Sequence, residues 1–153
     1  MEGRADESRI SPIDAATLGL SVHGGQPYLI VLGGLLEPGG FVDASGRPDV
    51  ARLRAILEAR VARLPVLTHR PMRRGDDWWW ESGEPDLDVH VREEPPEPGE
   101  RGFEAVCARL VMQPLPPDRP LWDLVLVPGA RPGRCGIVGV GAGTTGGFSR
   151  RVR

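Results

Sequence analysis

The chain has 153 residues, which is enough for one domain with a modest hydrophobic core. Hydrophobic residues make up 40% of it and charged residues 26%, as in globular proteins, and its longest apolar run, residues 28–36, is too short to span a bilayer. The net charge of -2 provides no basic surface for nucleic acid, and the first ten residues lack the apolar segment of a secretory signal. We therefore expect a cytoplasmic protein that does not bind nucleic acid.

The N-terminal half predicts two helices with a strand between them. Ser11, followed by Pro12 and then by Asp14 three residues after the cap, is the start signal of a short helix. Residues 26–36, QPYLIVLGGLL, are rich in aliphatic side chains and predict a buried strand. Residues 47–65 predict an amphipathic helix that ends at Pro65, with an apolar stripe formed by Val50, Leu53, Ile56, Leu57, Val61 and Leu64.

The C-terminal half predicts strands at residues 76–82 and 87–93, separated by the turn sequence SGEPD. A proline-rich connector at 93–102 leads to a helix at 103–113. Two further strands, at 121–127 and 135–140, are joined as a hairpin through PGARPGR. Because strands alternate with amphipathic helices, the sequence predicts a mixed α/β layered fold.

Residue usage limits what the arginines and cysteines can indicate. All 19 basic residues are arginine, and the chain contains 21 glycines and 16 prolines, which is typical of a GC-rich bacterial gene. The arginines therefore do not by themselves indicate anion binding. The two cysteines, Cys107 and Cys135, form no C-x-x-C pair and lie in apolar segments, so we expect buried free thiols.

Residues 141–146, GAGTTG, satisfy the pattern G-x-G-x-x-G of a dinucleotide-binding loop. Such a loop requires a following helix, a second strand and an acidic residue about twenty positions later. Only seven residues follow Gly146, none of them acidic, and the chain has no lysine for a phosphate-binding loop. The glycine pattern therefore does not predict nucleotide binding.

Asp86, Asp88 and His90 alternate along a predicted strand, so one face of that strand offers three metal-ligand types. A polar strand face explains the pattern better, and we expect no metal site. His23 and His69 have no acidic partner nearby in the sequence, and we expect surface or structural roles for them.

Trp78, Trp79 and Trp80 also alternate along a predicted strand. We expect at least one of them in the core and one exposed, because aromatic side chains dominate cores and interfaces. Stacking on a ligand is the alternative role for these rings, and the neighbouring Asp76 and Asp77 argue against nucleic acid as that ligand.

Three stretches together resemble one enzyme family: RISPIDAATLGL, PDLDVHVREEPPEPGE and MQPLPPDRPLWDLVLVPGARPGRCGIV. Their order and spacing are similar to those of the bacterial wax ester synthase/acyl-CoA:diacylglycerol acyltransferases. The resemblance covers most of the chain from Arg9 onward, and its most specific piece is RPLW, residues 119–122.

The resemblance implies a fold and a domain division. Complete members have the chloramphenicol-acetyltransferase-like fold, with two similar halves that flank an active-site tunnel. This chain would form an α/β (α+β) layered sandwich, a partial half of that fold without its C-terminal half. We expect a disordered N-terminus at residues 1–8, an incomplete N-terminal acyltransferase half-domain at 9–149 and a tail at 150–153.

In that family a strand runs into the motif H-H-x-x-x-D-G. Gly141 and Ala142 stand at its two histidine positions, and Gly146 stands at its aspartate position. The resemblance implies that the second histidine is the general base that takes the proton of an attacking alcohol. Because alanine cannot accept a proton, we assign no catalytic residue and expect the chain to be inactive alone, through in-frame decay or more than one sequence error.

The resemblance implies the activity of a diacylglycerol O-acyltransferase or wax ester synthase for the complete enzyme. An acyl group passes from the co-substrate acyl-CoA to diacylglycerol or a long-chain alcohol, with no cofactor. Pro120, Leu121 and Trp122 are expected to shape the substrate channel, although packing at the start of a strand fits them equally well. Lipid substrates also imply peripheral association with a membrane or lipid droplet.

Two alternatives remain open. The chain is either a non-catalytic half-domain that binds lipid, acyl-CoA or another protein through apolar surface, or a half-enzyme completed by a separately encoded second half.

Overall fold

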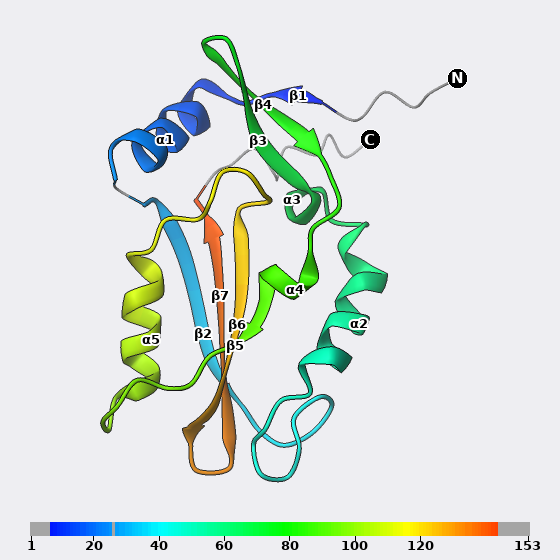
Figure 1. The fold of residues 1–153 in the computed structure, drawn as a ribbon, viewed down its shortest axis with the longest axis vertical. Coiled ribbons are helices and arrows are strands. Elements are labelled where there is room, and N and C mark those ends of the chain that lie inside the picture. Colours follow the sequence, from blue (N-terminus) through cyan, green and yellow to red (C-terminus); the bar gives the residue numbers. More distant parts are fainter. Residues whose placement is uncertain (1–6, 26, 144–153) are drawn as a thin grey trace.

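Two β-sheets form the framework of the protein, shown in Figure 1 as a computed structural model that describes residues 7–25 and 27–143. The larger sheet has the strand order β2 (Leu29–Leu36), β7 (Arg134–Ala142), β6 (Trp122–Arg131) and β5 (Val91–Glu93). β7 pairs antiparallel with both β2 and β6, whereas β5 pairs parallel with β6. The β6–β7 pair confirms the hairpin predicted through PGARPGR.

Helices cover both faces of the larger sheet (Figure 1). α5 (Gly102–Val111) packs on one face, and α2 (Val50–Val61), α3 (Pro65–Thr68) and α4 (Leu87–His90) lie on the other. The core under α5 is formed by Phe103, Val106, Leu110, Val125, Val127, Ala130, Val138 and Val140. The core under α2 is formed by Val42, Leu53, Val61, Val91, Trp122, Leu126 and Cys135. This arrangement confirms the layered α/β fold expected from the sequence.

The smaller sheet has the order β1 (Ser8–Arg9), β4 (Asp77–Ser82) and β3 (His69–Arg74), and its strands are antiparallel. Trp80 of β4 packs with Ile10 and with Leu18 of α1 (Pro12–His23) in a third core cluster. The sequence did not predict β3, which contains three arginines and a proline. β3 lies at the edge of its sheet, where a proline costs no ladder hydrogen bond.

The predicted helices are confirmed, and α1 and α2 start at residues whose side chains cap them. The Ser11 hydroxyl accepts a hydrogen bond from the Asp14 N–H at 3.2 Å, and the Asp49 carboxylate accepts one from the Arg52 N–H at 3.0 Å. α2 ends at Val61, earlier than predicted, and Pro65 begins α3 instead of ending α2. In the described part of the chain, no helix is both long and apolar enough to cross a membrane.

Two strand predictions were wrong. β2 is not buried: it forms an edge of the larger sheet, and the side chains of Ile30 and Leu32 are 58% and 74% exposed. Residues 87–93 are not one strand but the single turn of α4 followed by β5. The carboxylate of Asp86 accepts a hydrogen bond from the Asp88 N–H at 2.9 Å, which starts the helical turn in place of a strand.

Other expectations concern the ends of the chain and the tryptophans. Residues 1–6 and 144–153 lie outside the described residues, and Ser8, expected to be disordered, lies in β1, where it pairs with Trp80 of β4.

The expectation that one tryptophan of β4 is exposed was wrong, because all three are at least partly buried. The guanidinium of Arg74 lies 5.5 Å from the centroid of the Trp79 ring.

The cysteines are free, as expected. Cys135 is fully buried and Cys107 is half-buried, so the expectation of buried thiols is confirmed for Cys135 only. Burial raises the pKa of both thiols, which keeps them protonated and weakly nucleophilic.

Candidate functional site

Two segments that the resemblance singled out meet at one end of the larger sheet. β6 begins at Trp122, which pairs with Gly141 of β7. The backbone N–H of Ala142 donates to the carbonyl oxygen of Leu121 at 3.0 Å. The candidate site is therefore the end of the sheet at which residues 120–122 lie against residues 141 and 142.

The motif positions in this site carry no acid–base group. Gly141 and Ala142 are the last residues of β7 and are partly buried, whereas Gly146 lies outside the described residues. A side chain at position 141 would have room, because the nearest atom to an added Cβ is the Leu121 carbonyl oxygen at 3.9 Å. A Cβ at position 141 would therefore make only ordinary van der Waals contact.

Trp122 is a packing residue of this site. Its side chain is 9% exposed, and its indole N–H donates to the carbonyl oxygen of Leu67 at 2.9 Å. Its ring stacks on that of His90, with centroids 4.3 Å apart and an interplanar angle of 16°. Trp122 thus ties α3 and α4 to the start of β6.

The neighbours of Trp122 are also packed within the chain. Pro120 is buried, and Leu121 packs against the cluster of Ile10, Leu18 and Trp80. A role of residues 120–122 in shaping a substrate channel stays a prediction beside this packing role.

His90 acts here as a buried hydrogen-bond donor. Its side chain is 1% exposed, and its Nδ1 lies 2.6 Å from the carbonyl oxygen of Trp122. Since a carbonyl oxygen only accepts, Nδ1 carries the hydrogen. Burial lowers the pKa of His90 below its ordinary value, which favours the neutral imidazole.

The structure separates Asp86, Asp88 and His90, which the sequence placed on one strand face. Asp86 caps α4, Asp88 forms an ion pair with Arg54 at 2.8 Å, and His90 points into the core. Within the described residues, no group of three or more His, Cys, Asp or Glu side chains is placed to hold a metal ion.

The other two histidines lie away from the candidate site. His23 is exposed at the end of α1, with its Nε2 3.5 Å from a guanidinium nitrogen of Arg73. Nδ1 of His69, at the start of β3, lies 2.7 Å from the carbonyl oxygen of Pro65. Both histidines therefore lie outside β7, the strand that carries Gly141 and Ala142.

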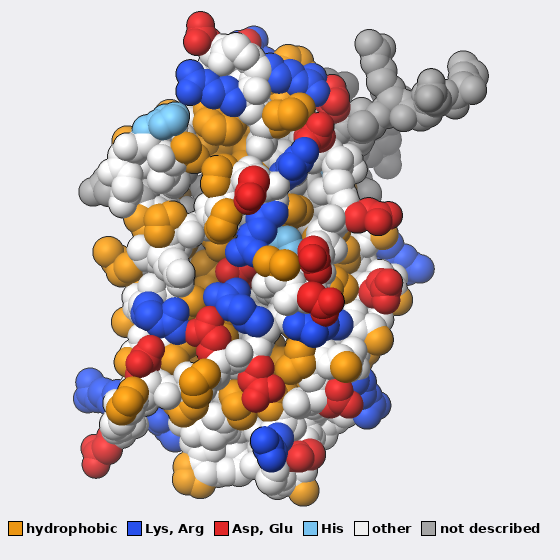
Figure 2. All heavy atoms as spheres, viewed as in Figure 1, with side chains coloured by type: hydrophobic (Ala, Val, Ile, Leu, Met, Phe, Trp, Pro, Cys, Tyr) orange, Lys and Arg blue, Asp and Glu red, His pale blue; other side chains and the backbone are white. Residues whose placement is uncertain are grey.

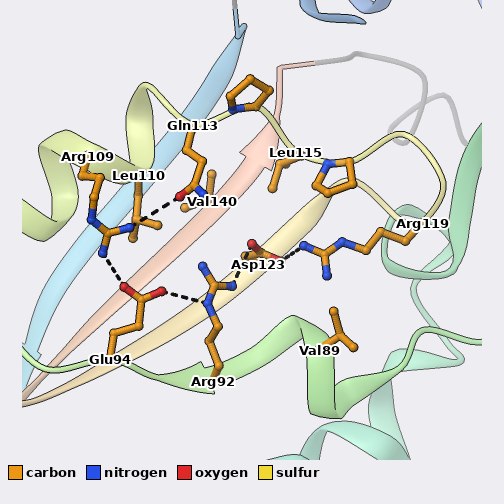
Figure 3. Close-up of a pocket in the computed structure, with 12 residues that line it drawn as sticks. Val89, Arg92, Glu94, Arg109, Leu110, Gln113, Leu115, Arg119, Asp123 and Val140 are labelled. Carbon is orange, nitrogen blue, oxygen red and sulfur yellow. Dashed lines mark hydrogen bonds and ion pairs between the residues drawn. The ribbon is translucent and has the colours of Figure 1, made fainter.

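Sequence reasoning missed a charged network on the α5 face, beside the candidate site (Figure 3). Arg92 of β5 donates to Glu94 and to Asp123, each at 2.8 Å. Asp123 also accepts from Arg119 at 3.2 Å, and Glu94 also accepts from Arg109. Although burial opposes it, hydrogen bonds from Arg109 and Arg92 lower the pKa of Glu94. The sequence could not predict this network, because the network depends on the parallel pairing of β5 with β6.

Sequence reasoning also missed an exposed apolar surface beside the motif positions. Ile30 pairs with Gly141 and Leu32 pairs with Gly139, so the two side chains lie on the α2 face of the sheet. They are 58% and 74% exposed, and the glycines opposite them have no side chains to cover them. We call these two side chains and the two glycines the β2 apolar surface.

Comparison with known proteins identifies the family. Residues 14–139 match the model of the wax ester synthase/diacylglycerol acyltransferase catalytic domain. A curated Mycobacterium tuberculosis protein named as a diacylglycerol O-acyltransferase is 34% identical over 137 residues, which cover 85% of this chain and 28% of that protein. A Mycobacterium bovis protein with the same type of name is 35% identical over 94 residues, 56% of this chain and 19% of that protein.

Solved structures agree on the fold. The wax ester synthase/diacylglycerol acyltransferase from Marinobacter aquaeolei VT8 is similar with a TM-score of 0.64 and 24% identity, over 88% of this chain and 34% of that one. The starter condensation domain of rhizomide synthetase is similar with a TM-score of 0.66 and 16% identity, over 90% of this chain and 34% of that one. A mutant of that domain in complex with C8-CoA gives a TM-score of 0.65 at 15% identity, over 89% of this chain and 31% of that one.

The chain spans 28% of the length of the curated M. tuberculosis relative and 34% of the Marinobacter structure. The matched segment runs from Asp14 of α1 through RPLW to Gly139 of β7, so it includes most of the stretches quoted above for the resemblance. Residues 9–13 and the motif positions 141, 142 and 146 lie outside it. The chain therefore belongs to the wax ester synthase/diacylglycerol acyltransferase family.

Proposed function

We propose that the chain is part of an O-acyltransferase domain that, when complete, transfers an acyl group from acyl-CoA to diacylglycerol or a long-chain alcohol. The observation that supports this most is the family match over residues 14–139. The contact of residues 120–122 with residues 141 and 142 is consistent with it, because it joins the two segments that the family uses at its site. Acyl-CoA and a lipid alcohol are then the ligands of the complete domain.

The chain on its own is proposed to be inactive. As the alcohol oxygen attacks the thioester carbonyl, its proton must pass to a base whose pKa lies near neutrality. Ala142 stands where the family has that base and offers no acceptor for the proton. A complete reaction would need both a histidine at this position and the remaining two thirds of a family domain.

A chimeric enzyme tests the proposed reaction class. Residues 14–139 of this chain replace the matching segment of the M. tuberculosis relative, which keeps its own motif and its own C-terminal part. We expect the chimera to form triacylglycerol from long-chain acyl-CoA and diacylglycerol. A folded chimera without activity, beside an active parent, would contradict the proposal.

A second candidate function is a non-catalytic binding half-domain, and the β2 apolar surface is the observation that favours it. Exposed apolar side chains that adjoin one another mark sites of association. The proposed occupant is the missing C-terminal half of a family domain, supplied by another polypeptide. Leu32→Ser should reduce binding of a hydrophobic dye, whereas Met112→Ser, which alters a 71% exposed side chain at the end of α5, should not.

Peripheral association with a lipid surface is proposed on the same ground. Co-sedimentation with neutral-lipid emulsions should be weaker for Leu32→Ser than for Met112→Ser. Equal sedimentation of both variants would remove the β2 apolar surface from this role and leave the acyltransferase proposal untouched.

A further inference from the structure

The charged network borders a hollow on the molecular surface. Its volume is about 340 Å³, and it lies between the end of α5, the loop at 113–119 and strands β5 and β6 (Figure 3). Charged side chains gather over the middle of this face of the molecule (Figure 2). Cavities of this size hold small ligands. We propose that this hollow, which we call the arginine hollow, binds a phosphate group.

The charges around the hollow favour an anion. Three guanidinium groups line it, from Arg92, Arg109 and Arg119, against two carboxylates, from Glu94 and Asp123. Arg109 also reaches Glu97, outside the lining, at 3.3 Å. Counted over the lining residues alone, the hollow has one more positive than negative side chain, and Glu97 outside the lining balances this charge.

The carboxylates are already occupied, whereas the arginines have hydrogen-bond donors to spare. Both oxygens of Glu94 accept from arginine, one from Arg92 and one from Arg109. Both oxygens of Asp123 do so as well, one from Arg92 and one from Arg119. Each guanidinium has five N–H donors. Arg92 uses two of them and Arg119 uses one, whereas Arg109 uses three, toward Glu94, Glu97 and Gln113, so the free donors are mainly those of Arg92 and Arg119. Phosphate offers many acceptors to these donors, and its geometry matches the guanidinium fork.

Arg119 is the least satisfied of the three. It donates to Asp123 at 3.2 Å through Nη2, and its Nε is buried without a hydrogen-bond partner among the described residues. A buried donor without a partner costs free energy. A phosphate would not reach this buried Nε, but it would accept charge-assisted hydrogen bonds from the outer nitrogens of the guanidinium, whose side chain is partly buried.

Apart from Gln113, the other residues that line the hollow are apolar, which suits a phosphate ester better than a bare ion. Leu110, Leu115 and Val140 line the side of the hollow next to α5 and β7. Three sources offer this chemistry: free phosphate, the phosphorylated nucleotide end of a coenzyme, and a lipid phosphate. The binding site itself does not depend on the proposed acyl-transfer function.

Titration of the whole chain tests the arginine hollow. Three probes are used: inorganic phosphate, adenosine 3′,5′-bisphosphate and dihexanoyl phosphatidic acid, each followed by calorimetry and by the NMR signals of the arginine Nε–H groups. We expect saturable binding of at least one probe, weakened at least tenfold by Arg119→Gln and only partly by Arg119→Lys. Arg63→Gln, which alters an exposed arginine beyond α2, should leave the affinity unchanged.

The results of this titration identify the source of the phosphate group and can also overturn the proposal. Tighter binding of the bisphosphate identifies a nucleotide ligand, and tighter binding of the phosphatidic acid identifies a lipid. If Arg119→Gln does not fold, Arg109→Gln replaces it, because the Arg109 side chain is 42% exposed and can be changed with less effect on packing. No saturable binding of any probe, or equal affinity for the Arg119→Gln and Arg63→Gln proteins, would overturn the proposal.

Discussion

The imidazole of His90 stacks on the indole of Trp122, and its Nδ1 donates to the backbone carbonyl of the same Trp122 at 2.6 Å. One buried side chain therefore holds both the ring and the backbone of the residue that begins β6. Because Trp122 also pairs with Gly141, the His90–Trp122 pair positions the end of the sheet where the candidate site lies.

Removing this ring should destabilise the fold. His90→Ala leaves a cavity beside Trp122 and a buried carbonyl without its donor, and we expect a loss of about 2–4 kcal/mol in the free energy of unfolding. Urea denaturation followed by tryptophan fluorescence measures it. His23→Ala is the control, because His23 is exposed and its loss should change stability by less than about 0.5 kcal/mol. Equal effects of the two substitutions would contradict the role assigned to His90.

Stability should fall between neutral and mildly acidic pH because of His90. Burial lowers its native pKa below the value in the unfolded chain, so the unfolded state binds a proton first as the pH drops. The contribution of neutral His90 to the free energy of unfolding is fully present above about pH 7. As the pH falls below about 6.5, this contribution is lost progressively, by up to about 1.4 kcal/mol per pH unit. Asp123 and Asp86 oppose this shift and Arg119 adds to it.

The measurement is the urea midpoint of the native chain and of His90→Gln across that pH range. The native chain should lose stability as the pH falls, and the variant should lose less. An identical slope for both proteins would show that other groups cause the dependence.

Gly136 should not tolerate a side chain. A Cβ at this position of β7 would lie 2.4 Å from Cε2 of Phe103, in the core under α5. We expect Gly136→Ala to cost about 1–3 kcal/mol, as overpacking does. Gly139→Ala is the matched control on the same strand, because its nearest neighbour would be 3.9 Å away. Thermal unfolding distinguishes the two, and a neutral Gly136→Ala would show that Phe103 moves aside freely.

Much of the fold could be predicted from local sequence signals. α1 follows from its capping residues, α2 and α5 follow from their apolar spacing, and the β6–β7 hairpin follows from two apolar runs with a glycine- and proline-rich turn. These features depend on residues close together in the chain. The resemblance located residues 120–122 and 141–142, and the structure brings these two segments together.

The exposure of β2, the strand β3 and the charged network could not be predicted, because they depend on pairing between residues that are distant in the sequence. The continuous aliphatic run LIVLGGLL predicts a buried strand. Among the described residues, however, β2 pairs with β7 alone, and the side chain of Leu32 is exposed. HRPMRR lacks any strand signal and is held as β3 through its register with β4. The charged network joins Arg92 to Asp123, 31 positions later, so only the sheet order reveals it.

Ester formation by the purified chain is the most direct measurement of its function. The chain is incubated with long-chain acyl-CoA and either a long-chain alcohol or diacylglycerol, with the chimeric domain as positive control. Because Ala142 occupies the position that we propose for the base, we predict no wax ester or triacylglycerol above the protein-free background. Ester formation that rises in proportion to the concentration of the purified chain would contradict this account.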